Sequence, residues 1–374
     1  MSAALARAEH AARQRWRPPP KLTISQWAER NLYLSAEDSA FTGLYSCDKA
    51  PYQRGILDAI GDPSIDSVAC MLSAQVGKTL MLKATVGYYA DQDPSTILLV
   101  QPTIEMAETF SKDRLAPMIR DSPALAGKIA DSRSRDSGNT ILHKQFPGGH
   151  ITMVGANAPA GLASRPIRVA LFDEVDRYPA SAGTEGDPIS LGIARTKTFW
   201  NRRIVMVSTP GDAETSRILK AWEASDQRRY WVPCPHCGEH QVLRWDQVTW
   251  PDDNPGAAVY VCEHCDSPWN EADRKAAVQW GEWRATHPER RKAGFHLNEL
   301  YSPFRRLSEI VDDYLAAKDT PELLKAWTNT SLGEPWREEE GEKVDADAIM
   351  PVSYTHLTLP TTLHECRSRW SPYH

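Results

Sequence analysis

Residues 68–79 read VACMLSAQVGKT, an apolar run that gives way to small residues and ends in Gly77, Lys78 and Thr79. This order predicts a buried strand, a phosphate-binding loop and the first turn of a helix. Gly77 lets the backbone approach a phosphate, Lys78 brings a positive charge to its oxygens, and the Thr79 hydroxyl can hold Mg²⁺. The other candidate cofactor-binding residues of the loop are Ser73, Ala74, Gln75 and Val76.

The loop departs from the usual phosphate-loop pattern at Leu72, which stands where that pattern has its first glycine. An ordinary strand-to-helix turn with an exposed lysine is therefore the competing interpretation. The helix expected over residues 80–90 would direct its free N–H groups and its dipole at a bound anion. Residues further along the chain have to decide between these interpretations.

Length and composition describe a soluble globular protein of two or three domains, because the 374 residues are 41% apolar and 25% charged. No apolar window of about 18 residues is present, so we expect no membrane span. The net charge of −6 argues neither for nor against a nucleic-acid partner, since a local basic face can coexist with an acidic total. Four of the seven cysteines form CxxC pairs in a chain without a secretory signal, which indicates metal binding in a reducing cytosol.

Four further apolar runs, at residues 96–100, 151–154, 169–172 and 204–207, predict further strands. The segments between them have helical spacing, so the strands should lie parallel in one sheet covered by helices. Functional residues of such a sheet gather at the carboxyl ends of its strands. The fold class predicted is α/β, with a doubly covered parallel sheet.

The run at residues 169–172 delivers Asp173 and Glu174 to the sheet edge. In a nucleotide hydrolase, Asp173 would hold Mg²⁺ and Glu174 would polarise the attacking water. Together with Lys78, this pair favours nucleotide hydrolysis over an idle turn. Ser208 and Thr209 end the next strand and either sense the γ-phosphate or cap a helix before Asp212.

Further candidates are less specific. Arg165 or Arg177 could offset charge on the transferred phosphoryl group, although either could be an ordinary surface charge. Tyr52 and Gln53 could stack on and hydrogen-bond an adenine, while core packing is the alternative for Tyr52.

Two CxxC knuckles, Cys234 with Cys237 and Cys262 with Cys265, predict a tetrahedral structural zinc site in a small ribbon-like module. A redox CxxC is the rival interpretation, but it needs no second pair. His236 and His264 lie inside the knuckles and are minor alternative ligands. Residues 274–336 are expected to be helical, with a turn at 294–297 and an amphipathic helix at 307–318.

Several motifs together resemble the large terminase subunit of tailed bacteriophages, in the lambda-like family that packages DNA into proheads. They are residues 159–166 (PAGLASRP), residues 171–179 (LFDEVDRYP), the double CxxC pattern and residues 329–336 (NTSLGEPW). The resemblance covers residues 20–345 and implies a P-loop ATPase of the ASCE type with ATP and Mg²⁺. It assigns the phosphate loop to Lys78 and Thr79, the Mg²⁺ site and catalytic base to Asp173 and Glu174, and the coupling motif to Ser208 and Thr209.

The resemblance also implies a domain organisation and partners. We expect an N-terminal segment (1–44), the packaging ATPase (45–222), the zinc module (228–270) and a helical linker (271–345). The family's RNase H-like nuclease domain is expected to be missing, because residues 351–374 resemble translated adapter or vector DNA. Implied partners are double-stranded DNA, a small terminase subunit, the portal and further copies of the chain, in the host cytoplasm without a membrane.

Two other functions remain open from the sequence. A DNA helicase or remodelling ATPase would share the core but should need a second helicase domain. A zinc-stabilised nucleic-acid-binding protein would leave the phosphate loop idle and would show no affinity for ATP.

Overall fold

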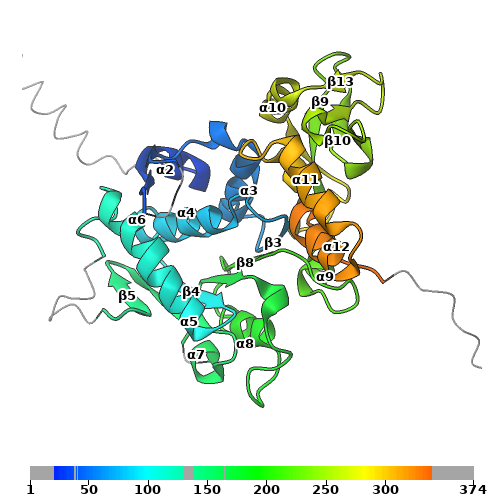
Figure 1. The fold of residues 1–374 in the computed structure, drawn as a ribbon. Coiled ribbons are helices and arrows are strands. Elements are labelled where there is room, and N and C mark those ends of the chain that lie inside the picture. Colours follow the sequence, from blue (N-terminus) through cyan, green and yellow to red (C-terminus); the bar gives the residue numbers. More distant parts are fainter. Residues whose placement is uncertain (1–20, 38, 40, 130–138, 164, 339–374) are drawn as a thin grey trace, which may run out of the picture. The chain divides into compact units, whose positions relative to one another are not determined.

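The predicted strands lie in one large sheet at the centre of the fold (Figure 1). The computed structural model of the chain describes residues 21–37, 39, 41–129, 139–163 and 165–338. Within these ranges ten strands form the sheet: β3 (Ser67–Leu72), β4 (Thr96–Gln101), β5 (His143–Phe146), β6 (Gly149–Gly155), β7 (Val169–Asp173), β8 (Arg203–Ser208), β9 (Arg228–Pro233), β10 (His240–Val242), β14 (Glu282–Ala285) and β15 (Ala293–Leu297). Their order is β10-β9-β15-β3-β8-β7-β4-β6-β5, with β14 paired to β9.

The five strands predicted from apolar runs are confirmed, and all of them run parallel. β3 pairs with β8, β8 with β7, β7 with β4 and β4 with β6. Every residue of β3 and β7 is buried, as expected of parallel strands covered on both faces. The polar strand ends predicted to carry function therefore meet at one edge of the sheet.

The stretch predicted as a turn at residues 294–297 is instead part of strand β15. It runs parallel to β3 on one side and to β9 on the other. The prediction was wrong because the strand has only five residues and contains a glycine, Gly294, which is typical of turns. In the structure, the Gly294 N–H donates a hydrogen bond of 2.9 Å to Asp226 Oδ1. Residues 274–336 are consequently not helical throughout.

Helices cover both faces of the sheet, and alternate residues of β3 supply the two cores. Val68, Cys70 and Leu72 pack on the face covered by α2, α3 and α4, while Ala69 and Met71 pack on the face covered by α7, α8 and α9 (Figure 1). The helices are α2 (Ile24–Asn31), α3 (Tyr52–Gly61), α4 (Lys78–Asp91), α5 (Ile104–Thr109), α6 (Ala116–Asp121), α7 (Pro159–Ala163), α8 (Pro188–Ala194), α9 (Arg217–Glu223), α10 (Glu271–Gln279), α11 (Leu307–Ala317) and α12 (Pro321–Trp327). Single π-helical turns, Phe110–Leu115 and Thr328–Leu332, join α5 to α6 and follow α12.

The cysteine-rich region is continuous with the main sheet. The first knuckle follows directly from β9, and a small sheet of β11 (Val248–Thr249), β12 (Val259–Val261) and β13 (Pro268–Trp269) carries the second. The described residues up to Arg337 form one compact unit, within which the expected bounds of the ATPase (45–222) and the zinc module (228–270) stay a prediction. A short pair, β1 (Tyr33–Leu34) and β2 (Gly43–Leu44), lies outside the main sheet.

An aromatic cluster joins the cysteine-rich region to the helices after β15. It consists of Trp245, Trp250, Tyr314 and Trp327, with the Trp245 ring 4.8 Å from that of Trp327 and 5.1 Å from that of Tyr314. Because Trp327 ends α12, this cluster braces the π-turn that follows. None of the described helices is long and apolar enough to cross a membrane.

Candidate active site and metal centre

The loop after β3 has the backbone shape of a phosphate-binding loop. Gln75 and Gly77 have positive φ angles of 58° and 93°, and α4 begins directly afterwards at Lys78. Glycine suits residue 77 because its φ of +93° strains other residues, and a Cβ there would also displace the Gln53 side-chain amide. The first N–H groups of α4 have no acceptor within the helix, so they can receive an anion.

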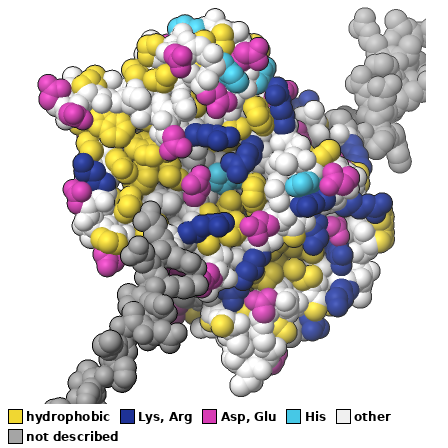
Figure 2. Space-filling view, turned by 90° about the vertical axis from the view of Figure 1, so that its right-hand side faces the viewer, with side chains coloured by type: hydrophobic (Ala, Val, Ile, Leu, Met, Phe, Trp, Pro, Cys, Tyr) yellow, Lys and Arg dark blue, Asp and Glu magenta, His cyan; other side chains and the backbone are white. Residues whose placement is uncertain are grey.

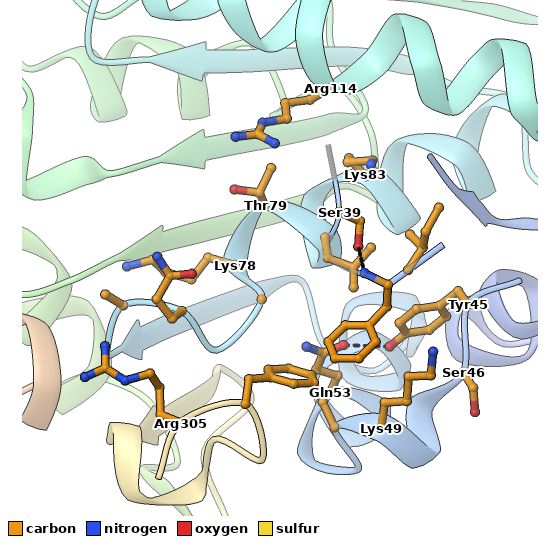
Figure 3. Close-up of a pocket in the computed structure, with 18 of the residues that line it drawn as sticks. Ser39, Tyr45, Ser46, Lys49, Gln53, Lys78, Thr79, Lys83, Arg114 and Arg305 are labelled. Atoms are coloured by element: carbon orange, nitrogen blue, oxygen red, sulfur yellow. Dashed lines mark hydrogen bonds between the residues drawn. The ribbon is translucent and has the colours of Figure 1, made fainter. Parts of the chain in front are cut away.

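A cavity of about 690 Å³ opens over this loop (Figure 3). Ala74, Gln75, Gly77, Lys78 and Thr79 line it from the loop side. The rest of its wall comes from distant segments, which contribute Tyr45, Lys49, Gln53, Arg114, Glu174, Phe304 and Arg305. The cavity is therefore assembled by the fold and not by one continuous motif.

Glu174 lies between the loop lysine and the end of β8. Its carboxylate is 3.2 Å from Lys78 Nζ and accepts a hydrogen bond of 3.2 Å from Thr209 Oγ1. Burial lowers the pKa of Lys78, while Glu174 opposes that shift. Glu174 itself has φ 53°, a strained backbone angle that occurs at functional sites. Three residues predicted separately, Lys78, Glu174 and Thr209, thus lie in contact.

Asp173 lies behind Glu174 at the end of β7 and is almost fully buried. Its carboxylate accepts a hydrogen bond of 2.9 Å from Gln101 Nε2, at the end of the neighbouring strand β4. Burial raises the pKa of Asp173 to about 6. A carboxylate in this position gains from a nearby cation, which would favour its charged form.

The structure places the two candidate adenine contacts differently. Tyr52 does not reach the cavity; it is fully buried and packs edge-on against Tyr230, which is the core role considered as the alternative. Gln53 does line the cavity, but its amide is used within the protein. It donates 3.0 Å to the Val76 carbonyl and accepts 2.7 Å from the Tyr45 hydroxyl, so it shapes the loop.

The two candidate arginines, Arg165 and Arg177, do not line the cavity. Arg165 is exposed and lies away from the cavity. The pKa of His143 in β5 is lowered mainly by burial of the His143 ring and, to a smaller extent, by the positive charge of Arg165. Arg177 is 3.8 Å from Glu174 but 63% exposed. The arginines that line the cavity are Arg114 and Arg305 (Figure 3), and the Arg305 guanidinium is also paired with Asp313 at 2.6 Å. No local motif marks either one in the sequence.

Other predicted residues occupy supporting positions. Ser73 and Val76 are fully buried, and neither lines the cavity. Ser208 donates 2.6 Å to the Thr209 carbonyl and accepts from Asp176 N, while Ser216 caps the next helix. Ser208 and Thr209 therefore do not cap a helix, and Thr209 instead contacts Glu174.

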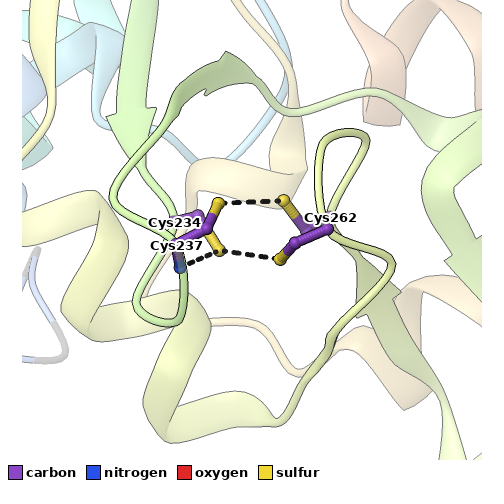
Figure 4. Close-up of side chains that lie close together, drawn as sticks. Cys234, Cys237 and Cys262 are labelled. Atoms are coloured by element: carbon purple, nitrogen blue, oxygen red, sulfur yellow. Dashed lines mark hydrogen bonds between the residues drawn. The ribbon is translucent and has the colours of Figure 1, made fainter.

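The four knuckle cysteines converge on one point (Figure 4). The Cys234 and Cys265 sulfurs are 3.8 Å apart, those of Cys237 and Cys262 are 4.0 Å apart, and all four lie within 4.8 Å of one another. Thiolates around a zinc ion with bonds of about 2.3 Å lie about 3.8 Å apart, so the set fits tetrahedral zinc.

The surroundings of the sulfurs are compatible with a metal centre. Backbone N–H groups of His236 and His264 point at Cys234 and Cys262, and Gln241 Nε2 lies 3.2 Å from Cys262 Sγ. Such donors stabilise metal-bound thiolates. The His236 and His264 rings face Asp273 and Glu263 instead of the sulfurs, so neither is a ligand in this arrangement.

Comparisons with known proteins give two family matches. The sequence profile for the phage terminase large subunit gpA, ATPase domain, matches residues 39–283, and that for the terminase large subunit gpA, endonuclease domain, matches residues 292–361. The large terminase subunit of Enterobacteria phage P21 is 33% identical over 366 residues, which cover 90% of this chain and 56% of that protein. That of Escherichia phage lambda is 31% identical over 376 residues, covering 93% and 58%. The chain thus spans little more than half the length of these relatives.

Among solved structures, the ATPase domain of the Thermus phage P74-26 large terminase aligns with a TM-score of 0.45 and 13% identity. The alignment covers 75% of this chain and 92% of that one.

The second family match corrects the expectation that the chain lacks nuclease-domain sequence. It begins at residue 292 and extends to residue 361, inside the stretch 351–374 that was predicted to be artificial. The expectation that endonuclease activity is absent rested on the missing nuclease sequence, so this match removes the reason for it. The described part of the match starts with β15, which belongs to the main sheet, while residues 1–20 and 339–374 lie outside the described structure.

Proposed function

Because this chain belongs to the family of phage terminase large subunits of the gpA type, we propose that it is an ATP-hydrolysing motor that moves double-stranded DNA during genome packaging. The observation that carries this proposal is the placement of Glu174 between Lys78 and Thr209 at the mouth of the phosphate loop. That arrangement joins the groups needed for hydrolysis to the end of a neighbouring strand that can respond to it.

In the proposed hydrolysis, Glu174 orients and polarises the attacking water, and Lys78 stabilises charge on the β- and γ-phosphates. Thr79 and Asp173 are the proposed ligands of Mg²⁺, which neutralises phosphate charge when bound. Arg114 and Arg305 replace Arg165 as the arginines that would offset charge in the transition state, since both line the cavity.

We propose that Thr209 couples hydrolysis to movement. Its hydroxyl donates to the same carboxylate that pairs with Lys78, so a change of charge at Glu174 alters both contacts. Two arrangements of the loop after β8 would then follow the nucleotide state.

DNA contact would be mainly to phosphates. The face that carries α11, α12 and the cysteine-rich strands shows many Lys and Arg side chains among Asp and Glu (Figure 2). A mixed face of this kind suits salt-dependent binding without sequence readout. The small terminase subunit, the portal and further copies of the chain are the proposed partners, in the host cytoplasm.

We further propose that Cys234, Cys237, Cys262 and Cys265 hold one structural Zn²⁺. The segment between the knuckles forms only short strands and has little apolar core of its own beyond the aromatic cluster. Zinc binding would supply the missing stability.

The proposed ATP-hydrolysis site is tested by measuring ATP hydrolysis by the full chain with and without double-stranded DNA. Glu174→Gln should lower kcat by about 100-fold or more, because the general base is lost. Lys78→Ala should weaken nucleotide binding as well as hydrolysis, because a charge on the phosphates is lost. The matched controls are Glu108→Gln and Lys112→Ala, an ion pair of 2.8 Å between α5 and the π-helical turn that follows it, neither of which lines the cavity.

Unchanged hydrolysis in both site variants would overturn the assignment. Intact DNA binding without any ATP affinity in calorimetry would instead favour a zinc-stabilised nucleic-acid-binding protein with an idle loop. ATP-driven strand separation would favour a helicase.

A further inference from the structure

Residues 328–336, far along the chain from the phosphate loop, contact the backbone at the start of that loop. The Thr330 carbonyl accepts a hydrogen bond of 2.7 Å from Ala74 N, and the Leu297 carbonyl of β15 accepts one of 2.9 Å from Ser73 N. These contacts occupy the first N–H groups of the loop.

Gly333 makes the closest approach of this segment to the loop. Its φ is +62°, and a Cβ there would lie 2.7 Å from Ser73 N and 3.2 Å from the Leu72 carbonyl carbon. Real Cβ atoms essentially never come so close to a backbone nitrogen. Leu72 occupies the position at which phosphate loops usually have a glycine, so the close backbone approach at this end of the loop depends on Gly333 instead.

His296 fixes the position of Gly333. Its Nε2 donates to the Gly333 carbonyl at 3.1 Å, and its Nδ1 lies 3.5 Å from an Arg229 guanidinium nitrogen. Burial, followed by the charge of Arg229, lowers the pKa of His296 to about 3. The ring is therefore neutral near pH 7 and keeps the tautomer that both contacts require.

The far end of the same segment holds the loop after β8. Trp336 N donates 3.0 Å to the Gly211 carbonyl, and Ala213 N donates 2.9 Å to the Trp336 carbonyl. Lys325 of α12 forms an ion pair of 2.5 Å with Asp212. This loop starts at Thr209, which contacts Glu174, and Glu174 contacts Lys78. The contacts form a closed ring that returns to the phosphate loop.

We infer that residues 328–336 are a positioning segment, which sets the phosphate loop and the Thr209 loop relative to each other. The segment touches no reacting atom and acts through Ser73, Ala74 and Gly211. Its role rests on the proposed ATPase function. It implies that nucleotide binding and the state of the Thr209 loop depend on the part of the chain that matches the endonuclease profile.

The first test is Gly333→Ala in the full chain, measured by calorimetric titration with MgADP. The added methyl should displace the Ser73 backbone and weaken MgADP binding by about tenfold. Gly183→Ala is the matched control, because Gly183 has a similar φ of +56° but only one neighbour, at 3.7 Å. The control should bind within twofold of the parent. Equal affinity of Gly333→Ala and Gly183→Ala would overturn the inference.

The second test addresses the loop after β8 through Lys325 of α12, which directly precedes the segment and pairs with Asp212 at the protein surface. Lys325→Glu places two like charges together at Asp212 and should lower kcat for ATP severalfold while leaving MgADP affinity within twofold. The exchange Lys325→Glu with Asp212→Lys should restore most of the rate. A reversal that leaves kcat unchanged, or an exchange that restores nothing, would show that this contact does not position the loop.

Failure of this inference differs from failure of the proposed function. One outcome is that Lys78→Ala and Glu174→Gln abolish hydrolysis while Gly333→Ala binds MgADP like Gly183→Ala and Lys325→Glu hydrolyses ATP like the parent chain. In that case only the positioning role of residues 328–336 is refuted. If the parent chain binds no MgADP, the proposed function itself fails.

Discussion

The cysteine cluster and the nucleotide cavity differ in how the chain builds them. The cluster takes its four sulfurs from two knuckles, each of four residues, so local geometry supplies most of the site. The cavity takes its groups from the ends of β3 and β7, from the π-turn after α5, and from residues 304 and 305. A metal centre of the first kind tolerates change elsewhere, whereas a cavity of the second kind depends on the whole sheet.

The largest effect should come from removing the metal ligands, which would break the local site. Cys262→Ser should abolish zinc binding and lower the free energy of unfolding by on the order of several kcal/mol, because zinc contributes directly to folding. Zinc content by mass spectrometry and thermal unfolding check this. Cys70→Ala, a buried cysteine outside the cluster, should keep one zinc per chain. A parent chain purified without zinc and equally stable would contradict the prediction.

A smaller effect should separate the cavity arginines from the one expected by sequence. Arg114→Gln and Arg305→Gln should each lower kcat by about tenfold or more, because preorganised charge near the phosphates is lost. Arg165→Gln should change kcat less than twofold, since Arg165 lies outside the cavity. Initial-rate kinetics at saturating ATP give kcat for each variant and so rank the three arginines by their effect. A larger loss from Arg165→Gln would restore the original assignment.

The smallest effect concerns pH. The pKa of Asp173 is about 6 in the fold, above its ordinary value of 3.8, so the folded chain binds this proton more tightly than the unfolded chain. Its contribution to stability is therefore present below about pH 4 and is lost as the pH rises through 6. Relative to Asp173→Asn, the parent should lose on the order of 1–3 kcal/mol of stability between pH 4 and 7 without Mg²⁺.

Denaturant unfolding at several pH values checks this difference. Mg²⁺ at pH 7 should reduce it, because a bound cation favours the charged carboxylate. Parallel stability curves for parent and variant would show that Asp173 titrates normally.

The sequence predicted the parts of both sites that have local signals. Val68–Leu72, Asp173 with Glu174, and the four cysteines all lie where apolar runs or fixed spacings placed them. Arg114, Arg305 and the strand β15 were missed, because an isolated arginine or a five-residue strand with glycine has no distinctive pattern. The sequence left two roles open for Tyr52, because a buried aromatic side chain and one that stacks on a base look alike in sequence. The structure buries Tyr52 in the core.

The position of β15 has a consequence for dividing this chain. The gpA ATPase profile ends at residue 283, ten residues before this strand begins. A fragment cut at that point would leave β3, and with it the phosphate loop, on an open sheet edge whose unpaired N–H and C=O groups invite association with other chains. A fragment meant to keep the phosphate loop in its native setting would need to include the chain through Trp336, beyond the end of the ATPase profile.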